Sequence, residues 1–280
     1  MSTTILRQPA VAGRFYPVDP YELRSEVRGY LSPSNGATQA PVPALGCVAP
    51  HAGYVYSGHV AGALFARVEI PRRCIILCPN HTGMGRALAI LSEGAWRTPL
   101  GDVPIDAALA AHLKQRFPAL EDDAAAHRAE HAAEVELPFL LLRQPQLKFV
   151  PIALGTGQFD VLEQLGLAMA EVIAAENNSA PREPILMVAS SDMNHYESDV
   201  VTRAKDHRAI ERILAVDPRG LYDVVTQQNI SMCGFGPAVA MLTAARQLGA
   251  KSADLVKYAT SGDISGDRDR VVGYAGILVR

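Results

Sequence analysis

Two histidines stand in short loops of a kind that suits metal or acid–base chemistry. His51 lies in Pro-His-Ala-Gly and His81 in Pro-Asn-His-Thr-Gly, and each loop follows an apolar run typical of a buried strand. Glycine lets the backbone turn sharply and lets a ligand come close, and neutral imidazole is a common ligand for zinc, iron and copper. One such loop is explained by helix capping. Two loops of the same form favour a metal site or an acid–base pair.

A third loop carries a carboxylate and an imidazole three positions apart, Asp192 and His195. A carboxylate that accepts a hydrogen bond from an imidazole fixes its tautomer and raises its basicity. We therefore expect Asp192 to orient His195, and His195 to move protons. The alternative is that Asp192 caps a following helix together with the two serines before it.

Cys233 stands in Met-Cys-Gly-Phe-Gly-Pro, just before an apolar helical pattern. The dipole of a helix lowers the pKa of a thiol at its N-terminus, and a soft thiolate suits zinc, copper or ferrous iron. The alternative is a small hydrophobic residue packed against glycines. The other three cysteines, Cys47, Cys74 and Cys78, lie in strand-like runs and are expected in the core.

The segment Glu-His-Ala-Ala-Glu-Val-Glu at residues 130–136 is dense in ligand types. It does not match HExxH, so the signature of zinc proteases is absent. Acids near the start of a helix are favoured by its dipole, and we interpret Glu130 as such a solvated residue. His131 and Glu134 stay open as residues of a pocket wall.

Short strand-like runs alternate with helical patterns, which predicts one α/β domain over residues 1–280. Its central sheet is mostly parallel or mixed, with helices on both faces. The carboxyl ends of parallel strands meet at one edge, so we expect His51, His81 and His195 to converge there.

The predicted strands are Ala44–Ala49, Arg73–Cys78, Ala87–Ser92, Lys148–Leu154, Ile185–Ala189, Leu255–Thr260 and Val271–Val279. The predicted helices are Ser57–Arg67, Ile105–Phe117, His131–Arg143, Asp160–Ala175, Val201–Val216 and Pro237–Leu248. We expect a linker at Ser32–Pro43, because its Pro, Ser, Asn and Gly residues prevent regular structure.

Composition narrows the classes of function. The 280 residues include 26 Lys and Arg and 29 Asp and Glu, for a net charge of −3. This balance argues against a nucleic-acid or anionic-membrane partner. No segment matches a signal peptide or a membrane span. Four cysteines without a CxxC pair favour a reducing, cytoplasmic compartment. The absence of GxGxxG, P-loop and GxSxG motifs leaves nucleotide hydrolysis and α/β-hydrolase chemistry without support.

The order of several motifs resembles the Memo family, also called AmmeMemoRadiSam system protein B. These motifs are AGRFYP, PHAGYVYSG, CPNHTG, EHAAEVELPFL, SSDMNHY, MCGFGP and SGDISGDRDRVVGYAG, from about Ala12 to the C-terminus. The resemblance implies a fold similar to the class III extradiol dioxygenases, the LigB-type non-haem iron enzymes. It also implies association with radical-SAM and AMMECR-type proteins in a shared pathway.

The resemblance further implies a mononuclear metal site held by His51, His81 and Cys233. Asp192 and His195 would line the same pocket, with Phe15 and Tyr54 in its wall. In the dioxygenases the metal set is two histidines and a carboxylate, and Cys233 looks to take the carboxylate's place. A thiolate there changes the charge distribution and redox properties of the iron.

Three hypotheses about function follow. The first is a metal-dependent oxidoreductase with Fe(II) or copper, rather than zinc, in which the metal takes O₂ or a small substrate, His195 moves protons and Asp192 orients it. The second is a non-enzymatic module that binds a peptide or a small ligand in the same pocket. The third is a hydrolase in which zinc activates water and His195 is the base.

Overall fold

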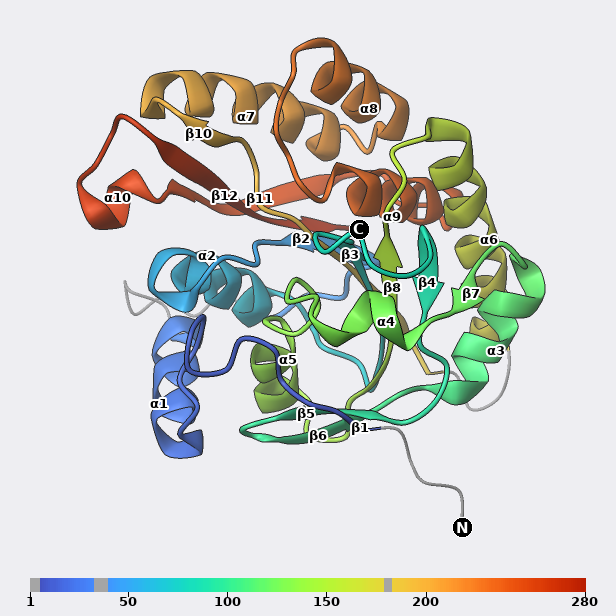
Figure 1. Ribbon diagram of the computed structural model, residues 1–280. Coiled ribbons are helices and arrows are strands. Elements are labelled where there is room, and N and C mark those ends of the chain that lie inside the picture. Colours follow the sequence, from blue (N-terminus) through green and yellow to red (C-terminus); the bar gives the residue numbers. More distant parts are fainter. Residues whose placement is uncertain (1–5, 33–39, 179–182) are drawn as a thin grey trace.

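A nine-stranded mixed sheet runs through the centre of the computed structural model (Figure 1), which describes residues 6–32, 40–178 and 183–280. Its strand order is β10-β12-β2-β9-β3-β8-β4-β7, and β11 pairs with β12. Strands β2, β9, β3 and β8 are parallel neighbours, whereas β12 and β4 run antiparallel to β2 and β8. A second sheet has the order β1-β5-β6. The α/β class and the mixed sheet predicted from the sequence are therefore correct.

The bounds of the elements follow the chain. The strands are β1 (Leu6–Arg7), β2 (Gly46–Ala49), β3 (Arg73–Pro79), β4 (Leu88–Ile90), β5 (Ala95–Thr98), β6 (Gly101–Pro104), β7 (Glu121–Asp122), β8 (Lys148–Leu154), β9 (Ile185–Ser190), β10 (His195–Glu197), β11 (Ala253–Thr260) and β12 (Val271–Val279). The helices are α1 (Pro20–Leu31), α2 (Tyr54–Arg67), α3 (Ala107–Arg116), α4 (Ala124–Arg128), α5 (Leu137–Arg143), α6 (Phe159–Asn177), α7 (Asp199–Leu214), α8 (Pro218–Gln227), α9 (Phe235–Gln247) and α10 (Gly262–Ser265).

Alternate residues of the central strands face two separate hydrophobic cores. Along β3, Ile75 and Leu77 belong to one core, whereas Cys74, Ile76 and Cys78 belong to the other. This alternation follows from the two-residue repeat of a strand. Helices α6, α7, α8 and α9 cover the first face, and α1, α2, α5 and the small sheet cover the second (Figure 1). The buried cysteines predicted for the core, Cys47 included, are there.

Most predicted elements are present within a few residues, with one clear error in the helices. The helix predicted over His131–Arg143 begins only at Leu137, and residues 131–136 form turns. Side chains of this segment bind neighbouring loops rather than following a helical face, as described below. The sequence patterns also missed α1, α4, α8, α10 and several strands of two to four residues. Residues 33–39 of the predicted linker lie outside the described part of the chain.

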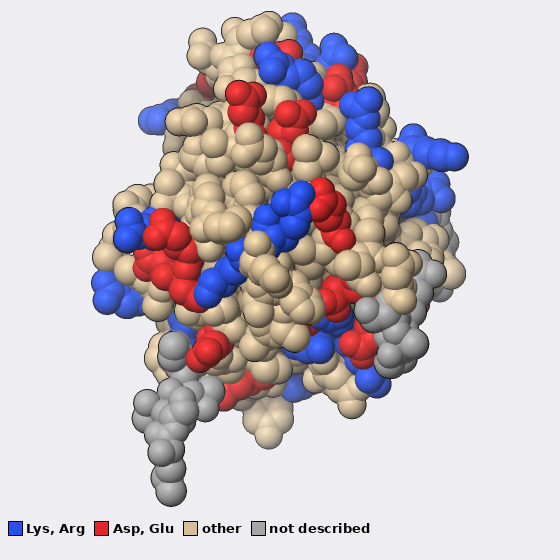
Figure 2. Space-filling model, turned by 90° about the vertical axis from the view of Figure 1, so that its right-hand side faces the viewer, with Lys and Arg blue, Asp and Glu red and all other residues tan. Residues whose placement is uncertain are grey.

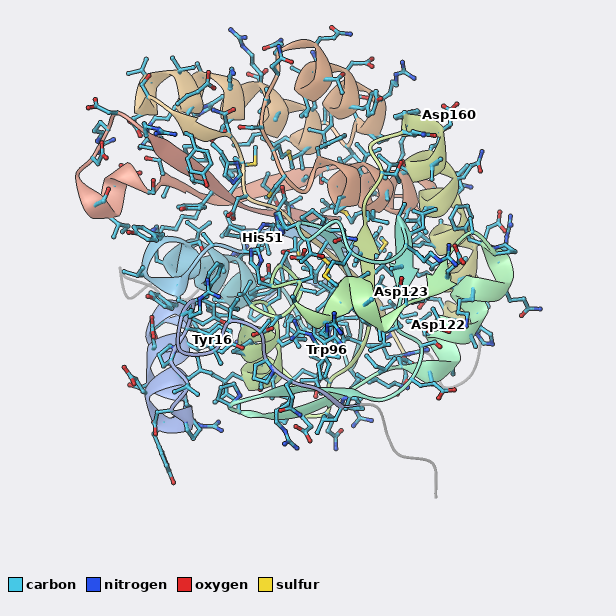
Figure 3. All side chains as sticks on the ribbon, viewed as in Figure 1. Tyr16, His51, Trp96, Asp122, Asp123 and Asp160 are labelled. Atoms are coloured by element: carbon cyan, nitrogen blue, oxygen red, sulfur yellow. The ribbon has the colours of Figure 1, made fainter. Side chains whose placement is uncertain are left out.

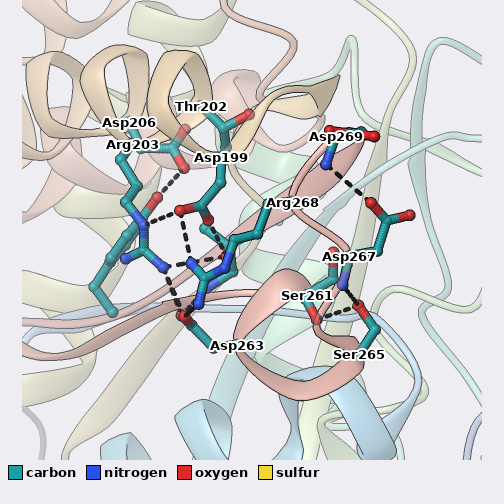
Figure 4. Close-up of polar contacts among 12 residues, drawn as sticks. Asp199, Thr202, Arg203, Asp206, Ser261, Asp263, Ser265, Asp267, Arg268 and Asp269 are labelled. Atoms are coloured by element: carbon teal, nitrogen blue, oxygen red, sulfur yellow. Dashed lines mark hydrogen bonds and ion pairs between the residues drawn. The ribbon is translucent and has the colours of Figure 1, made fainter.

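Helix α7 is attached to the sheet by polar contacts as well as by apolar packing (Figure 4). Asp199 binds Arg203 and Arg268 at 2.9 and 2.7 Å, and both arginines also contact Asp263. One turn further on, the fully buried Asp206 accepts hydrogen bonds from Tyr258 Oη and from the amide of Asn194. These contacts tie α7 to β11, to the α10 loop and to the segment before His195.

The close contact between Asp206 and β12 requires glycine at position 273. A Cβ atom added to Gly273 would lie 1.8 Å from Asp206 Oδ2, much closer than atoms can approach. The same glycine exchanges backbone hydrogen bonds with residues 193 and 194. Any larger residue at 273 would displace the segment that leads into β10.

Asp206 should make stability depend on pH near neutrality. Burial raises its pKa to about 7, despite the opposing hydrogen bonds from Tyr258 and Asn194. A carboxyl whose pKa is raised on folding stabilises the fold below its unfolded pKa, and that contribution is lost as the pH rises through about 7. The free energy of unfolding from urea titrations should therefore fall by roughly 1–3 kcal/mol between pH 5 and 8. Asp206→Asn should flatten this slope, and an equal slope in both proteins would contradict the assignment.

Candidate metal centre

Three parallel neighbours of the large sheet deliver the candidate residues to one edge. His51 follows β2, Asp192 follows β9 and His81 follows β3, and the order β2-β9-β3 places these strand ends side by side. Ligands bind at this carboxyl edge in open α/β sheets. Figure 3 shows His51 near the middle of the molecule, where these loops meet. His51 and His81 therefore meet at this edge as expected, and His195 lines the same cavity.

A cavity of about 580 Å³ lies at this edge. Its lining includes the predicted residues His51, His81, Asp192, His195 and Cys233, together with Phe15 and His131. The lining is also partly aromatic, because Tyr196 and Tyr274 contribute to it. A volume of this size suits a small ligand.

His51 is buried, and both of its ring nitrogens have a defined neighbour. Its Nδ1 lies 2.9 Å from Ser190 Oγ, and its Nε2 lies 3.2 Å from Cys233 Sγ. Burial lowers the pKa of His51 well below its usual value, and the nearby His131, His81 and His195 add to this effect. The ring is therefore neutral at physiological pH, which is the form that binds metals.

Glu130 orients His81 and is not the solvated residue that its place near a helix start suggested. Its carboxylate is fully buried, lies 2.9 Å from His81 Nδ1 and accepts the backbone amides of His81 and Ala132. Burial opposes its ionisation most strongly, but the hydrogen bond and charge of His81, the amide of Ala132 and His131 together outweigh burial, so the pKa of Glu130 is lowered. Because Nδ1 is engaged by the carboxylate, Nε2 of His81 is free for a metal. In the sequence, the only signal that Glu130 orients a histidine was its position directly before His131.

Three imidazoles come close enough to share an ion. Candidate donor atoms of His51, His81 and His131 all lie within 4.8 Å of one another. The rings of His81 and His131, however, are stacked, with centroids 4.7 Å apart and planes at 17°. A lone pair of imidazole lies in the plane of its ring, so two stacked rings cannot both direct a lone pair at the same ion. His51 stands nearly perpendicular to both.

Cys233 lies beside His51 at the start of α9, as its position in the sequence predicted. A nitrogen and a sulfur bound to one ion at about 2.1 and 2.3 Å are separated by roughly 3.1–3.6 Å, and Cys233 Sγ lies 3.2 Å from His51 Nε2. The predicted lowering of the thiol pKa is wrong for the metal-free protein. Burial and the nearby Asp192 raise the pKa of Cys233, despite the hydrogen bonds that oppose them. A metal ion would therefore have to displace the thiol proton.

Asp192 and His195 share the cavity but do not form the predicted pair. Asp192 Oδ1 accepts the backbone amide of His51 at 2.8 Å, so the carboxyl braces the first histidine loop. Burial raises the pKa of Asp192 to about 7, and the amides of His51 and Ala52 oppose this rise. Asp192 also caps no helix, because α7 begins only at Asp199 after Ser198.

His195 takes its orientation from Ser231 instead. The hydroxyl oxygen of Ser231 accepts a hydrogen bond from the backbone amide of His195. The backbone carbonyl oxygen of Ser231 lies 2.8 Å from His195 Nδ1. A carbonyl only accepts, so Nδ1 carries the proton of the neutral ring and Nε2 keeps its lone pair. The next residue, Tyr196, has a left-handed φ of 62°, a strained conformation for a side chain of this size. No sequence motif indicated Ser231.

Two residues expected in the pocket wall lie outside the cavity. Tyr54 is buried and donates to the carbonyl of Val135, and Glu134 is fully buried against the N-terminal segment. The carboxylate of Glu134 accepts hydrogen bonds from Arg7, Tyr16 and the amides of residues 10 and 11. It therefore holds the chain that carries Phe15 rather than facing a ligand. Phe15 does line the cavity, and its ring contacts His131.

Glu130→Gln should weaken metal binding without unfolding the protein. The amide keeps the shape of the carboxyl but loses the charge that strengthens His81 as a donor, and loss of such a partner costs roughly 10–100-fold in metal affinity. Calorimetric titration with Zn²⁺ measures the change. Glu121→Gln, on an exposed carboxyl 3.4 Å from Arg86, is the matched control and should bind as the parent does. Equal affinity of the Glu130 variant and the parent would contradict the role of Glu130.

The fold and the cavity together define the structural class of this protein. This is an α/β protein whose histidines and cysteine gather at the carboxyl edge of a mixed sheet. A crystal structure of an uncharacterized protein from Escherichia coli K12 has a similar fold, with a TM-score of 0.53 and 11% identity. The match covers 83% of this chain and 98% of that one.

The chain belongs to the Memo family. The family model described as Memo-like protein matches residues 7–278. A MEMO1 family protein of Methanopyrus kandleri is 42% identical over 284 residues, covering 98% of this chain and 99% of that protein. A second, from Methanothermobacter thermautotrophicus, is 39% identical, with 97% and 99% covered. These matches confirm the resemblance drawn from the ordered motifs.

Proposed function

We propose that this protein is a metal-dependent redox enzyme whose ion is held by His51, His81 and Cys233. The observation that carries the proposal is the donor arrangement. The free Nε2 of His51 faces a thiol at 3.2 Å, and a second imidazole with a carboxylate partner stands in the same cavity. Two imidazoles and one thiolate suit ferrous iron or copper. We prefer Cys233 to His131 as the third donor because His131 is stacked on His81.

The chain's own residues would then divide the work around the ion. Asp192 holds the loop of His51, and Glu130 holds the ring of His81. His195 lines the cavity as a neutral imidazole, so it would take a proton from a bound small molecule. The bound metal would supply the redox chemistry, with O₂ as the expected oxidant. Phe15, Tyr196 and Tyr274 give the cavity an aromatic part of its lining.

The proposal is tested by anaerobic reconstitution with Fe(II), Cu(II) and Zn(II), each followed by metal analysis and measurement of O₂ uptake. We expect one Fe(II) or copper ion per chain and O₂ uptake only with a redox-active metal. His51→Ala and His81→Ala should abolish both, whereas His112→Ala, on an imidazole with 55% of its side chain exposed, should change neither. No bound metal would refute the proposal. Zinc alone would favour a hydrolase, and metal without turnover would favour a module that binds a peptide or small ligand.

The cellular setting belongs to the same proposal. All four cysteines are free thiols, which suits a reducing compartment such as the cytoplasm. No helix in the described residues is long and apolar enough to cross a membrane. On the face shown in Figure 2, basic and acidic side chains are interspersed, which supports a small ligand rather than nucleic acid as the partner. We also propose a pathway shared with radical-SAM and AMMECR-type proteins.

A further inference from the structure

We infer that Glu136 is a neutral carboxylic acid which, through Ser190, holds His51 in the tautomer that leaves Nε2 free. Glu136 is then a positioning residue of the metal site, although it does not line the cavity. The inference rests on the proposed function for its purpose, because a free Nε2 matters only if an ion binds there. Its geometry does not depend on any metal.

The hydroxyl of Ser190 is the centre of the arrangement. Its Oγ lies 2.7 Å from the carbonyl of Ala132, 2.9 Å from Glu136 Oε1 and 2.9 Å from His51 Nδ1. Ser190 and Glu136 are fully buried, and His51 nearly so. The second oxygen of Glu136, Oε2, is buried without a hydrogen-bond partner among the described residues.

Counting protons selects one assignment. The carbonyl of Ala132 only accepts, so the single proton of Ser190 goes to it over the shortest of the three distances. Ser190 Oγ must then accept from both other neighbours. His51 donates from Nδ1, and Glu136 donates from a protonated Oε1. Under this assignment every buried donor has an acceptor, and only a neutral carbonyl oxygen of Glu136 stays unpaired.

An ionised Glu136 would leave a much costlier arrangement. Its Oε1 and the carbonyl of Ala132 would compete for one proton, and its Oε2 would be a buried, charged oxygen without any donor. Glu136 interacts electrostatically with the ionisable groups of Asp192, Cys47, Cys78 and Tyr54. None of these groups can carry a positive charge. Burial raises the pKa of Glu136 well above its usual value, the hydrogen bond with Ser190 opposes this, and Asp192 adds to it.

The two histidines of the site therefore differ in the hydrogen-bond partner of Nδ1. His81 Nδ1 faces the carboxylate of Glu130, which strengthens the ring as a metal donor. His51 Nδ1 faces a neutral hydroxyl, which fixes the tautomer without adding charge. Neutral Glu136, acting through Ser190, thus keeps the proton of His51 on Nδ1. It does so without placing a second negative charge beside the ion.

The experiment compares the parent, Glu136→Gln and Ser190→Ala as metal-free proteins at pH 7. Infrared difference spectra between the parent and the Gln variant should show the carbonyl stretch of one protonated carboxyl in the parent. Nitrogen-15 NMR of the histidines should show His51 protonated at Nδ1 in the parent and in Glu136→Gln, because the amide donates to Ser190 as the acid does. Ser190→Ala should change this single tautomer into a mixture of both.

Glu130→Gln is the matched control, since it should leave the infrared band of Glu136 in place. A carboxylate signal in place of the protonated band would overturn the inference, as would a mixed tautomer in the parent or an unchanged one in Ser190→Ala. If Glu136→Gln folds poorly by circular dichroism, the parent and Ser190→Ala still decide the tautomer. All of these readouts are taken without metal, so a failure of the metal proposal in Zn²⁺ and Fe(II) titrations is separate from a failure here.

Discussion

Cys233→Ser should lose more than about 100-fold in metal affinity while the protein stays folded. Loss of an outer hydrogen-bond partner already costs roughly 10–100-fold, and this change removes the proposed anionic donor itself. Serine is close in size to cysteine, so the fold should lose only about 1–3 kcal/mol if its hydroxyl is unpaired. Metal stoichiometry by mass spectrometry and circular dichroism measure the two effects. The parent should also release one more proton on metal binding than the variant, because its thiol is protonated without metal.

Two further variants make this result specific. Cys47→Ser changes a buried thiol of β2 outside the cavity lining and should bind metal as the parent does. His131→Ala tests the competing donor set, and the stacking of His131 on His81 predicts only a small change in affinity. Full metal stoichiometry and affinity in Cys233→Ser, with loss in His131→Ala, would exchange the roles of these two residues.

Glu134→Ala should destabilise the protein by about 3–5 kcal/mol, the cost of breaking a buried ion pair from one side. The change leaves the Arg7 guanidinium, 6% exposed, without its carboxylate. The hydroxyl of Tyr16 and two backbone amides lose their acceptor as well. Urea titration of the metal-free protein measures the free energy of unfolding.

Glu121→Ala is the matched surface control. Half of that side chain is exposed and its contact with Arg86 is long, so the free energy of unfolding should change by less than about 0.5 kcal/mol. A loss of less than about 1 kcal/mol in Glu134→Ala would mean that the N-terminal segment contributes little to the fold.

The class of fold and the place of the site could be predicted from the sequence, because both depend on local patterns. Strand-like runs such as Arg73–Cys78 and Lys148–Leu154 are buried on both faces and read as continuous apolar segments. The loop after Arg73–Cys78 then carries Pro79, His81 and Gly83 within five residues. Parallel pairing then brings loops to a common edge whatever their distance along the chain, which is why His51, His81 and His195 converge.

The hydrogen-bond partners of these side chains were decided only by tertiary structure. Asp192 was expected to bind His195 because they are three residues apart, yet β10 turns His195 toward Ser231 and leaves Asp192 on the His51 loop. Glu130 and Glu134 have the same chemistry and lie one helical turn apart in sequence. One orients His81 and the other binds Arg7, because residues 131–136 do not form the helix that would have placed them on one face.

The protonation states of the site residues also depend on tertiary structure rather than on the local sequence. The position of Cys233 before a helix is plain from the sequence and predicts a lowered thiol pKa. The folded protein raises this pKa, since burial and the nearby Asp192 outweigh the hydrogen bonds that favour the thiolate. Residue types and their order determined which groups reach the cavity. Burial and the contacts between distant segments decided which of them carry protons, because desolvation depends on the whole surroundings of a group and not on its neighbours in sequence.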